Sequence, residues 1–253
     1  MKDSFCHPLK GWFLKQKTEI KLLFRSIPAV VVALFVISVV SMNILANKTI
    51  YQNGWIAIDG GILVSWLSFL CMDIITKHFG PKASIKITIF AMLINLLVCL
   101  IFYVVSIIPA GEEFNEFNHV IGGTWYVLLS STIAFLSSGL LNIILNYFTG
   151  KIFKKNPDGK LAFYTRSYVS TFIAQFFDNL IFAMLAFMVF FPIYLGFSWN
   201  FTECVTCSFL GAIIELACEA LFSPIGYRVT KAWKKDGVGA SYLSYINEGD
   251  YNL

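Results

Sequence analysis

Acidic side chains stand inside stretches of this sequence that are otherwise apolar. Asp73, Asp178, Glu215 and Glu219 lie well within such stretches, and Asp59 lies nearer the edge of one. A carboxylate at the centre of a membrane-spanning helix costs about 2.5 to 3.5 kcal/mol on the insertion scale, so each acid requires a reason to be there. Almost no basic residues share these stretches. We therefore expect a water-filled central cavity in which the acids bind a ligand or carry protons.

Further polar residues recur at helical spacing along four of the apolar stretches, so that each helix presents one polar stripe. Bonding between helices explains the Ser, Thr and Asn stripe of the fourth stretch as readily as a cavity does. The stripes comprise Asp59, Trp66 and Asp73; Thr124, Ser131, Ser138, Asn142 and Thr149; Ser167, Thr171, Gln175 and Asp178; and Ser208, Gly211, Glu215 and Glu219.

A carboxylate beside an aromatic ring suits one chemical class of ligand. The two oxygens accept a pair of adjacent N–H donors while the ring stacks on a flat heterocycle, and the edge of a guanine has this pattern. Trp66, Phe69, Phe176, Phe177 and Phe182 are placed to supply stacking, although most aromatic residues must face lipid or pack between helices. A purine-like small molecule is therefore the expected ligand.

The elements that position these residues are membrane helices. The 253 residues are 57% hydrophobic and 13% charged, whereas about 25% of residues are charged in soluble domains. We predict an all-α integral membrane protein with six transmembrane helices. The six apolar segments cover about 27–46, 56–76, 86–108, 124–148, 168–196 and 204–227. No room remains for a nucleotide-hydrolysing domain, and no Gly-x-x-x-x-Gly-Lys-Ser/Thr motif occurs.

The distribution of Lys and Arg predicts the orientation in the membrane. Of the 19 basic residues, only Lys48 falls in a loop on the opposite side, so both termini are expected to be cytoplasmic. We divide the chain into a cytoplasmic segment 1–26, a transporter domain 27–231 and a cytoplasmic tail 232–253. The first segment is either an amphipathic helix on the membrane surface or a solvated basic leader. Two inverted three-helix halves would place Asp73 and Asp178 on the middle helix of each.

Enzymatic and metal chemistry are not expected. All three histidines lie in loops or at span ends, and Cys204 and Cys207 have no second pair to complete a zinc site. No nucleophile, base and metal share one membrane depth. We expect no cofactor, no metal and no nucleic-acid partner.

Three motifs resemble those of a known family. Ser41-Met-Asn43 at the end of the first span resembles a Ser-x-Asn signature, and Asp73-Ile-Ile-Thr76-Lys77-His78-Phe79-Gly80 is similar to Asp-x-x-Thr-Glu-x-Tyr/Phe-Gly. The run from Arg166 through Ser170 and Gln175 to Asp178 resembles an Arg…Ser…Gln/Asn-x-x-Asp pattern. Together they resemble the vitamin uptake transporter family, the queuosine precursor transporters, over residues 27 to 231.

The resemblance implies a multi-pass importer in the inner (plasma) membrane for 7-deazaguanine precursors of queuosine, in nitrile or aminomethyl form. It assigns the substrate site to Asn43, Asp73, Thr76, Arg166, Gln175 and Asp178, to which the stripe analysis adds Trp66. Two departures are Lys77, where many members have Glu, and Glu215 and Glu219, where a lysine is expected. These extra acids would tune charge or carry a proton, and they favour the cationic aminomethyl form.

Two alternatives remain open at this point. The chain could be a substrate-capture subunit that needs a separate energising complex, or a membrane scaffold that transports nothing. The expected partners are the small-molecule substrate and the lipid bilayer, with a homodimer as an open alternative.

Overall fold

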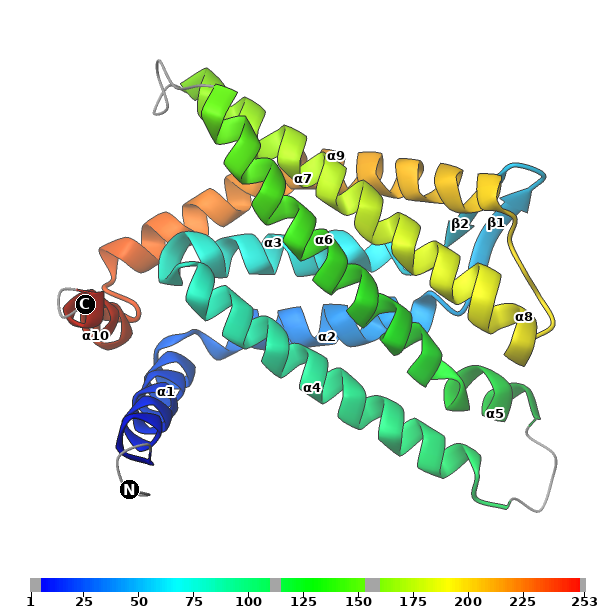
Figure 1. Ribbon diagram of the computed structural model, residues 1–253, viewed down its shortest axis with the longest axis horizontal. Coiled ribbons are helices and arrows are strands. Elements are labelled where there is room, and N and C mark those ends of the chain that lie inside the picture. Colours follow the sequence, from blue (N-terminus) through cyan, green and yellow to red (C-terminus); the bar gives the residue numbers. More distant parts are fainter. Residues whose placement is uncertain (1–5, 110–114, 153–159, 251–253) are drawn as a thin grey trace.

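The computed structural model describes residues 6–109, 115–152 and 160–250, and it is helical apart from one short hairpin (Figure 1). The elements in chain order are α1 (Cys6–Ser26), α2 (Ala29–Leu45), β1 (Thr49–Asn53), β2 (Ile56–Asp59), α3 (Ile62–Phe79), α4 (Pro81–Ser106), α5 (Asn115–Gly122), α6 (Thr124–Ile152), α7 (Lys160–Ala183), a π-helical segment (Met184–Phe190), α8 (Phe191–Tyr194), α9 (Phe201–Lys235) and α10 (Ala240–Asp250).

The composition of the long helices suits a bilayer. Among the described residues, five helical segments are long and apolar enough to cross a membrane, and there are six when α2 is counted with α1, from which it is bent by 100°. The outer surface is apolar as well: Leu93, Leu97 and Leu100 of α4 are each more than half exposed. The protein is therefore an all-α membrane protein with lipid-facing leucines where a soluble protein has charge.

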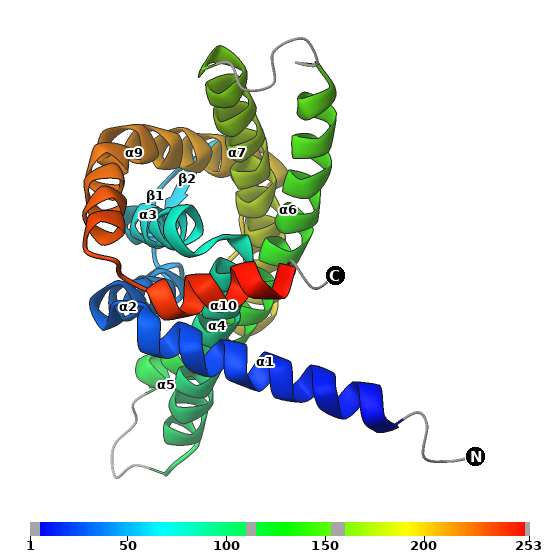
Figure 2. The same cartoon turned by 90° about the vertical axis from the view of Figure 1, so that its left-hand side faces the viewer.

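The six long helices enclose the centre of the molecule. α3 packs against α9, α9 against α7, α7 against α6, and α6 against α4, which returns to α3. α2 packs on α3, α4 and α6. The view along the bundle in Figure 2 shows these helices side by side, with α1 and α10 crossing one end.

The second apolar segment begins as a strand, which corrects the expectation that a helix starts near residue 56. β2 pairs with β1 in an antiparallel hairpin that turns at Gly54, whose φ is +61°. Gly60 then runs so close to α2 that a Cβ there would lie 2.6 Å from the Leu45 carbonyl oxygen. The expected alignment of Asp59 with Trp66 and Asp73 on one helix is wrong, because Asp59 belongs to β2.

The fifth apolar segment is not one continuous α-helix. α7 ends at Ala183 and passes through the π-helical segment Met184–Phe190 into the single turn α8. Pro192 lies in the first turn of α8 and has no N–H to donate to the preceding turn, so the regular α-helical bonding cannot pass through it.

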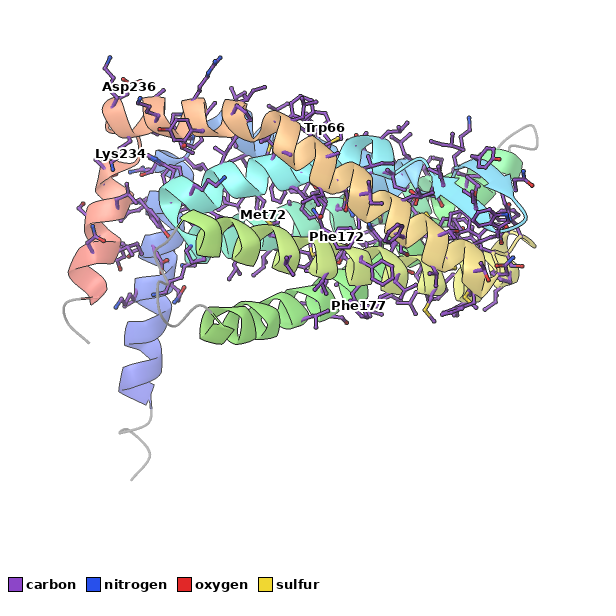
Figure 3. The ribbon with its side chains drawn as sticks, turned by 90° about the horizontal axis from the view of Figure 1, so that it is seen from above. Trp66, Met72, Phe172, Phe177, Lys234 and Asp236 are labelled. Atoms are coloured by element: carbon purple, nitrogen blue, oxygen red, sulfur yellow. The ribbon has the colours of Figure 1, made fainter. Side chains whose placement is uncertain are left out.

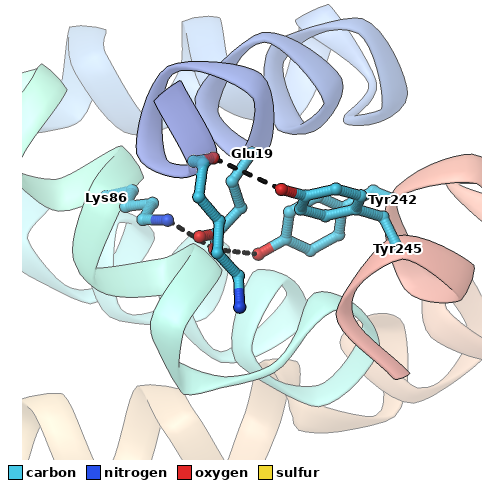
Figure 4. Close-up of polar contacts among 5 residues, drawn as sticks. Glu19, Lys86, Tyr242 and Tyr245 are labelled. Atoms are coloured by element: carbon cyan, nitrogen blue, oxygen red, sulfur yellow. Dashed lines mark hydrogen bonds and ion pairs between the residues drawn. The ribbon is translucent and has the colours of Figure 1, made fainter. Parts of the chain in front are cut away.

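The first and last helices, α1 and α10, lie at the end of the bundle opposite the hairpin (Figure 1). There Glu19 of α1 is buried and forms an ion pair with Lys86 of α4, and the Tyr242 hydroxyl of α10 donates to the Glu19 carboxylate over 3.4 Å (Figure 4). Burial and the neighbouring Glu19 raise the pKa of Tyr242 to about 12. These contacts fix both terminal helices to the bundle. That this end is cytoplasmic stays a prediction.

Candidate functional site

A central cavity lies between the long helices, and we divide it into two adjoining lobes. The hairpin lobe reaches the end of β2 and has an empty volume of about 480 Å³, including its open mouth. This size falls in the usual range of small-molecule sites, about 300 to 1,000 Å³. Its polar lining consists of Asn43, Asp59, Ser65, Ser131, Asp178, Asn179 and Glu215.

Hydrogen bonds from neighbouring helices hold two of the acids in this lobe. Ser138 Oγ of α6 donates to Asp178 Oδ1 of α7 over 2.6 Å. Asn179 Nδ2, the next residue along α7, donates to Glu215 Oε2 of α9 over 3.3 Å. α7 thus carries adjacent polar side chains to two different helices, which fixes the positions of both carboxylates.

Asp59 supplies a third carboxylate from the end of β2. Its Oδ1 accepts from the Gly61 backbone N–H over 2.7 Å, and Cys207 Sγ lies 3.7 Å from its Oδ2. Burial raises the pKa of Asp59 to about 6, although the Gly61 bond acts in the opposite direction. No Lys or Arg is among the described residues that line this lobe, so a ligand meets an acidic wall.

Phe69 of α3 and Phe182 of α7 line the hairpin lobe beside these acids. A flat ring can therefore stack while its donors reach a carboxylate. Two other aromatic residues considered from the sequence lie elsewhere. Trp66 stacks on Phe222 of α9 with ring centroids 4.2 Å apart, and Phe177 is 40% exposed. Figure 3 labels Trp66 and Phe177.

The α4 lobe continues the cavity between α2, α3, α4 and α6, with an empty volume of about 540 Å³. It shares Met42, Asn43, Phe69, Ser131 and Asp178 with the hairpin lobe. The remaining lining is largely apolar and contains two more methionines, with three added polar residues. Those added polar residues are Ser68, Thr88 and Asn95.

The hairpin reaches the cavity through Asp59 and is fixed to the start of α9. Asn200 and Glu203 form a reciprocal cap of α9, and the second Glu203 oxygen accepts from Gln52 Nε2 over 2.8 Å. Thr206 Oγ1 donates to the Trp55 carbonyl oxygen over 2.5 Å. One acid therefore both caps α9 and holds β1, the strand that pairs with the Asp59-bearing strand β2.

The structure brings together Asn43, Asp178 and Glu215 of the site residues expected from the sequence. Three others are not among the described residues that line the two lobes. Trp66 packs on α9, the Thr76 hydroxyl donates to the Met72 carbonyl oxygen over 2.8 Å, and Gln175 is buried one turn before Asn179. The side chains of Asp73, Arg166 and Glu219 lie outside the described residues.

Sequence reasoning missed Ser65, Asn95 and Asn179 as cavity residues. Asn179 is next to Asp178 but about 100° around the helix, so it fell outside the expected stripe. Asn95 did carry a signal, because it is a lone amide deep within the apolar helix α4. Among the described residues, no group of three His, Cys, Asp or Glu could hold a metal ion.

Comparison with known proteins identifies one family. No curated protein and no solved structure matches the chain. A family model described as "Putative vitamin uptake transporter" matches residues 59–229, from Asp59 at the end of β2 into the second half of α9. The matched region includes all three carboxylates of the hairpin lobe. Since the match covers more than half of the 253 residues, the chain belongs to this family of vitamin uptake transporters.

Proposed function

We propose that the protein is a secondary importer of a queuosine precursor, a 7-deazaguanine in nitrile or aminomethyl form, across the inner membrane. One observation carries the proposal: Asp59, Asp178 and Glu215 line a single lobe together with Phe69 and Phe182. The N1–H and 2-amino groups of a deazaguanine are adjacent donors on one edge of a flat ring. A carboxylate accepts both while a phenyl ring covers the face.

The two asparagines of the lobe suit the rest of such a ring. Asn43 and Asn179 each offer an amide donor and an amide acceptor, which match the O6 acceptor and the ring N–H groups of a deazaguanine. Ser138 holds Asp178 on one side of the lobe, and Asn179 holds Glu215 on the other. We assign Asp178 to the donor edge of the heterocycle, and Glu215 to tuning the charge of the cavity or carrying a proton.

Ligand binding is the first test. The purified protein is melted with both queuosine precursors, guanine, queuine and several water-soluble vitamins. A ligand at about 100 times its dissociation constant adds roughly 2.7 kcal/mol of stability, so a substrate stands clear of the panel. A shift with a deazaguanine supports the proposal. A shift with a vitamin and none with any deazaguanine overturns the substrate.

Transport by the purified chain is the second test. Liposomes that contain only this protein are loaded with a pH or ion gradient and given labelled precursor. We expect accumulation that depends on the gradient. Binding without accumulation would instead indicate a substrate-capture subunit that needs a separate energising complex, and no binding of any compound would favour a scaffold.

A further inference from the structure

The α4 lobe contains a buried hydrogen-bond donor without a partner. Asn95 is 1% exposed and lines this lobe, and its Nδ2 has no hydrogen-bond partner in the described structure. An unpaired buried donor is costly, and native proteins rarely leave one without a bound partner. The partner of Asn95 Nδ2 is therefore a molecule that occupies the lobe, either a water or a ligand that displaces it.

The other polar groups added by this lobe are already engaged. Ser68 Oγ donates to the Ser65 carbonyl oxygen over 2.7 Å, and Thr88 Oγ1 lies 4.0 Å from Met72 Sδ. Of the three polar residues that the α4 lobe adds, Asn95 is thus the one whose donor remains available to a ligand.

The two lobes differ in charge. Asp59 and Glu215 line only the hairpin lobe, and Asp178 lies where the lobes meet. Beyond Asp178, the described lining of the α4 lobe carries no charged side chain and is rich in methionine and phenylalanine. The one carboxylate of the α4 lobe, Asp178, is already assigned to the donor edge of the heterocycle, so an ammonium group there would lose its water without a free carboxylate to pair with. A neutral acceptor loses less on entering.

We propose that the α4 lobe is a subsite for a neutral hydrogen-bond acceptor on the substrate, to which Asn95 Nδ2 donates. This inference rests on the proposed function, in which Asp178 already holds the donor edge of the heterocycle. In the queuosine precursors the acceptor is the nitrile nitrogen, while the aminomethyl form carries only donors at that position. The subsite therefore favours the nitrile form, which revises the expectation drawn from the number of acids alone.

The test compares three ligands on purified protein by calorimetric titration: the nitrile form, the aminomethyl form and unsubstituted 7-deazaguanine. The variant is Asn95→Leu, which keeps the side-chain size and removes the amide. We expect its affinity for the nitrile form to fall about tenfold, with the affinity for unsubstituted 7-deazaguanine unchanged. The matched control is Asn247→Leu, which changes an exposed asparagine of α10 and should leave all three affinities unchanged.

Folding is checked by melting the ligand-free variant. Because Asn95→Leu removes an unpaired donor from an apolar region, its melting temperature should not fall below that of the wild type. Equal losses for all three ligands, or an unchanged nitrile affinity, would overturn the subsite while leaving the proposed function intact. If the wild type binds none of the three ligands, the proposed function fails and the subsite fails with it.

Discussion

Ser138 and Asp178 are joined across two helices by a short polar contact in the cavity wall: Ser138 Oγ donates to Asp178 Oδ1 over 2.6 Å. The bond uses one carboxylate oxygen and holds the side chain in one rotamer. The other oxygen remains for a ligand, because Asp178 lines both lobes. A residue of α6 thus sets the direction in which an acid of α7 can bind.

Asp178→Asn should weaken binding of a deazaguanine by at least about tenfold, since a hydrogen bond to a charged group contributes roughly 1.5 to 3 kcal/mol. Ser138→Ala should weaken it less, by a few-fold, because the carboxylate remains and only its orientation is lost. Both affinities are measured by titration of purified protein.

The matched control for the charge change is Asp236→Asn. Asp236 is exposed at the end of α9 far from the hairpin (Figure 3), so the same loss of a carboxylate should leave affinity unchanged. Asp178→Asn protein that binds as tightly as the wild type would remove Asp178 from the site.

Gly211→Ala should lower ligand affinity without lowering the stability of the protein. A Cβ at Gly211 would lie 2.8 Å from Asn179 Nδ2, the atom that donates to Glu215. The flexible amide can move aside, so the helix gains up to about 1 kcal/mol from the loss of glycine. We expect ligand affinity to fall several-fold, measured by titration, while the melting temperature holds or rises.

Gly226→Ala is the control on the same helix, because a Cβ there would meet only Ile74 and Leu70 side chains at 3.3 Å or more. It should leave affinity unchanged. If Gly211→Ala also leaves affinity unchanged, Asn179 has no part in binding.

The membrane architecture could be predicted from the sequence because its cause is local. Long apolar runs can satisfy their backbone groups in lipid only as helices or closed barrels, so composition indicated the helical spans directly. The acids at Asp178 and Glu215 were found for the same reason, since a carboxylate within an apolar run needs a polar neighbour.

Features that depend on packing between helices could not be predicted in this way. The strand that ends at Asp59 belongs to the same apolar segment as α3, and only packing shows that Gly60 must lie close to Leu45 of α2. Helical periodicity placed Trp66 on the stripe of the acids, but the stripe used the wrong starting residue because Asp59 is not helical. The periodicity of a single helix also does not indicate which neighbouring helix a side chain contacts.

The contribution of Asp59 to the stability of the protein should fall as the pH rises through the range in which its carboxyl group ionises. Burial raises the pKa of Asp59 from 3.8 to about 6, so the folded state binds a proton more tightly than the unfolded state. Its contribution is complete below about pH 4 and is lost as the pH rises through 6, a change of about 3 kcal/mol.

Asp59→Asn removes this pH-dependent contribution to stability, because an amide does not ionise. We expect the melting temperature of the variant, measured in detergent, to rise relative to that of the wild type as the pH is increased from 4 to 7. A difference that stays constant across this range would show that Asp59 does not titrate there.

Lys86→Met should destabilise the end of the bundle that carries both termini. It leaves the buried Glu19 carboxylate without its ion-pair partner, and because Lys86 is partly exposed we expect a loss of about 1 to 3 kcal/mol. Melting in detergent measures the loss, and proteolysis of α1 should become faster.

Adding Glu19→Gln to Lys86→Met should recover part of the stability, whereas Lys17→Met, at an exposed lysine of α1, should have little effect. Additive effects of the two changes at Glu19 and Lys86 would contradict coupling between them.

Substitution of two aromatic residues one turn apart on α3 should have different effects, on ligand affinity at Phe69 and on stability at Trp66. Phe69 lines both lobes, so Phe69→Leu should weaken deazaguanine binding by about two- to tenfold through loss of stacking. Trp66 instead stacks on Phe222 and donates its indole N–H to the Leu63 carbonyl oxygen. Trp66→Leu should therefore lower the melting temperature and leave affinity unchanged. Titration and melting of both variants check the pair, and a loss of affinity confined to Trp66→Leu would mean that the ligand lies against α9 and not between the lobes.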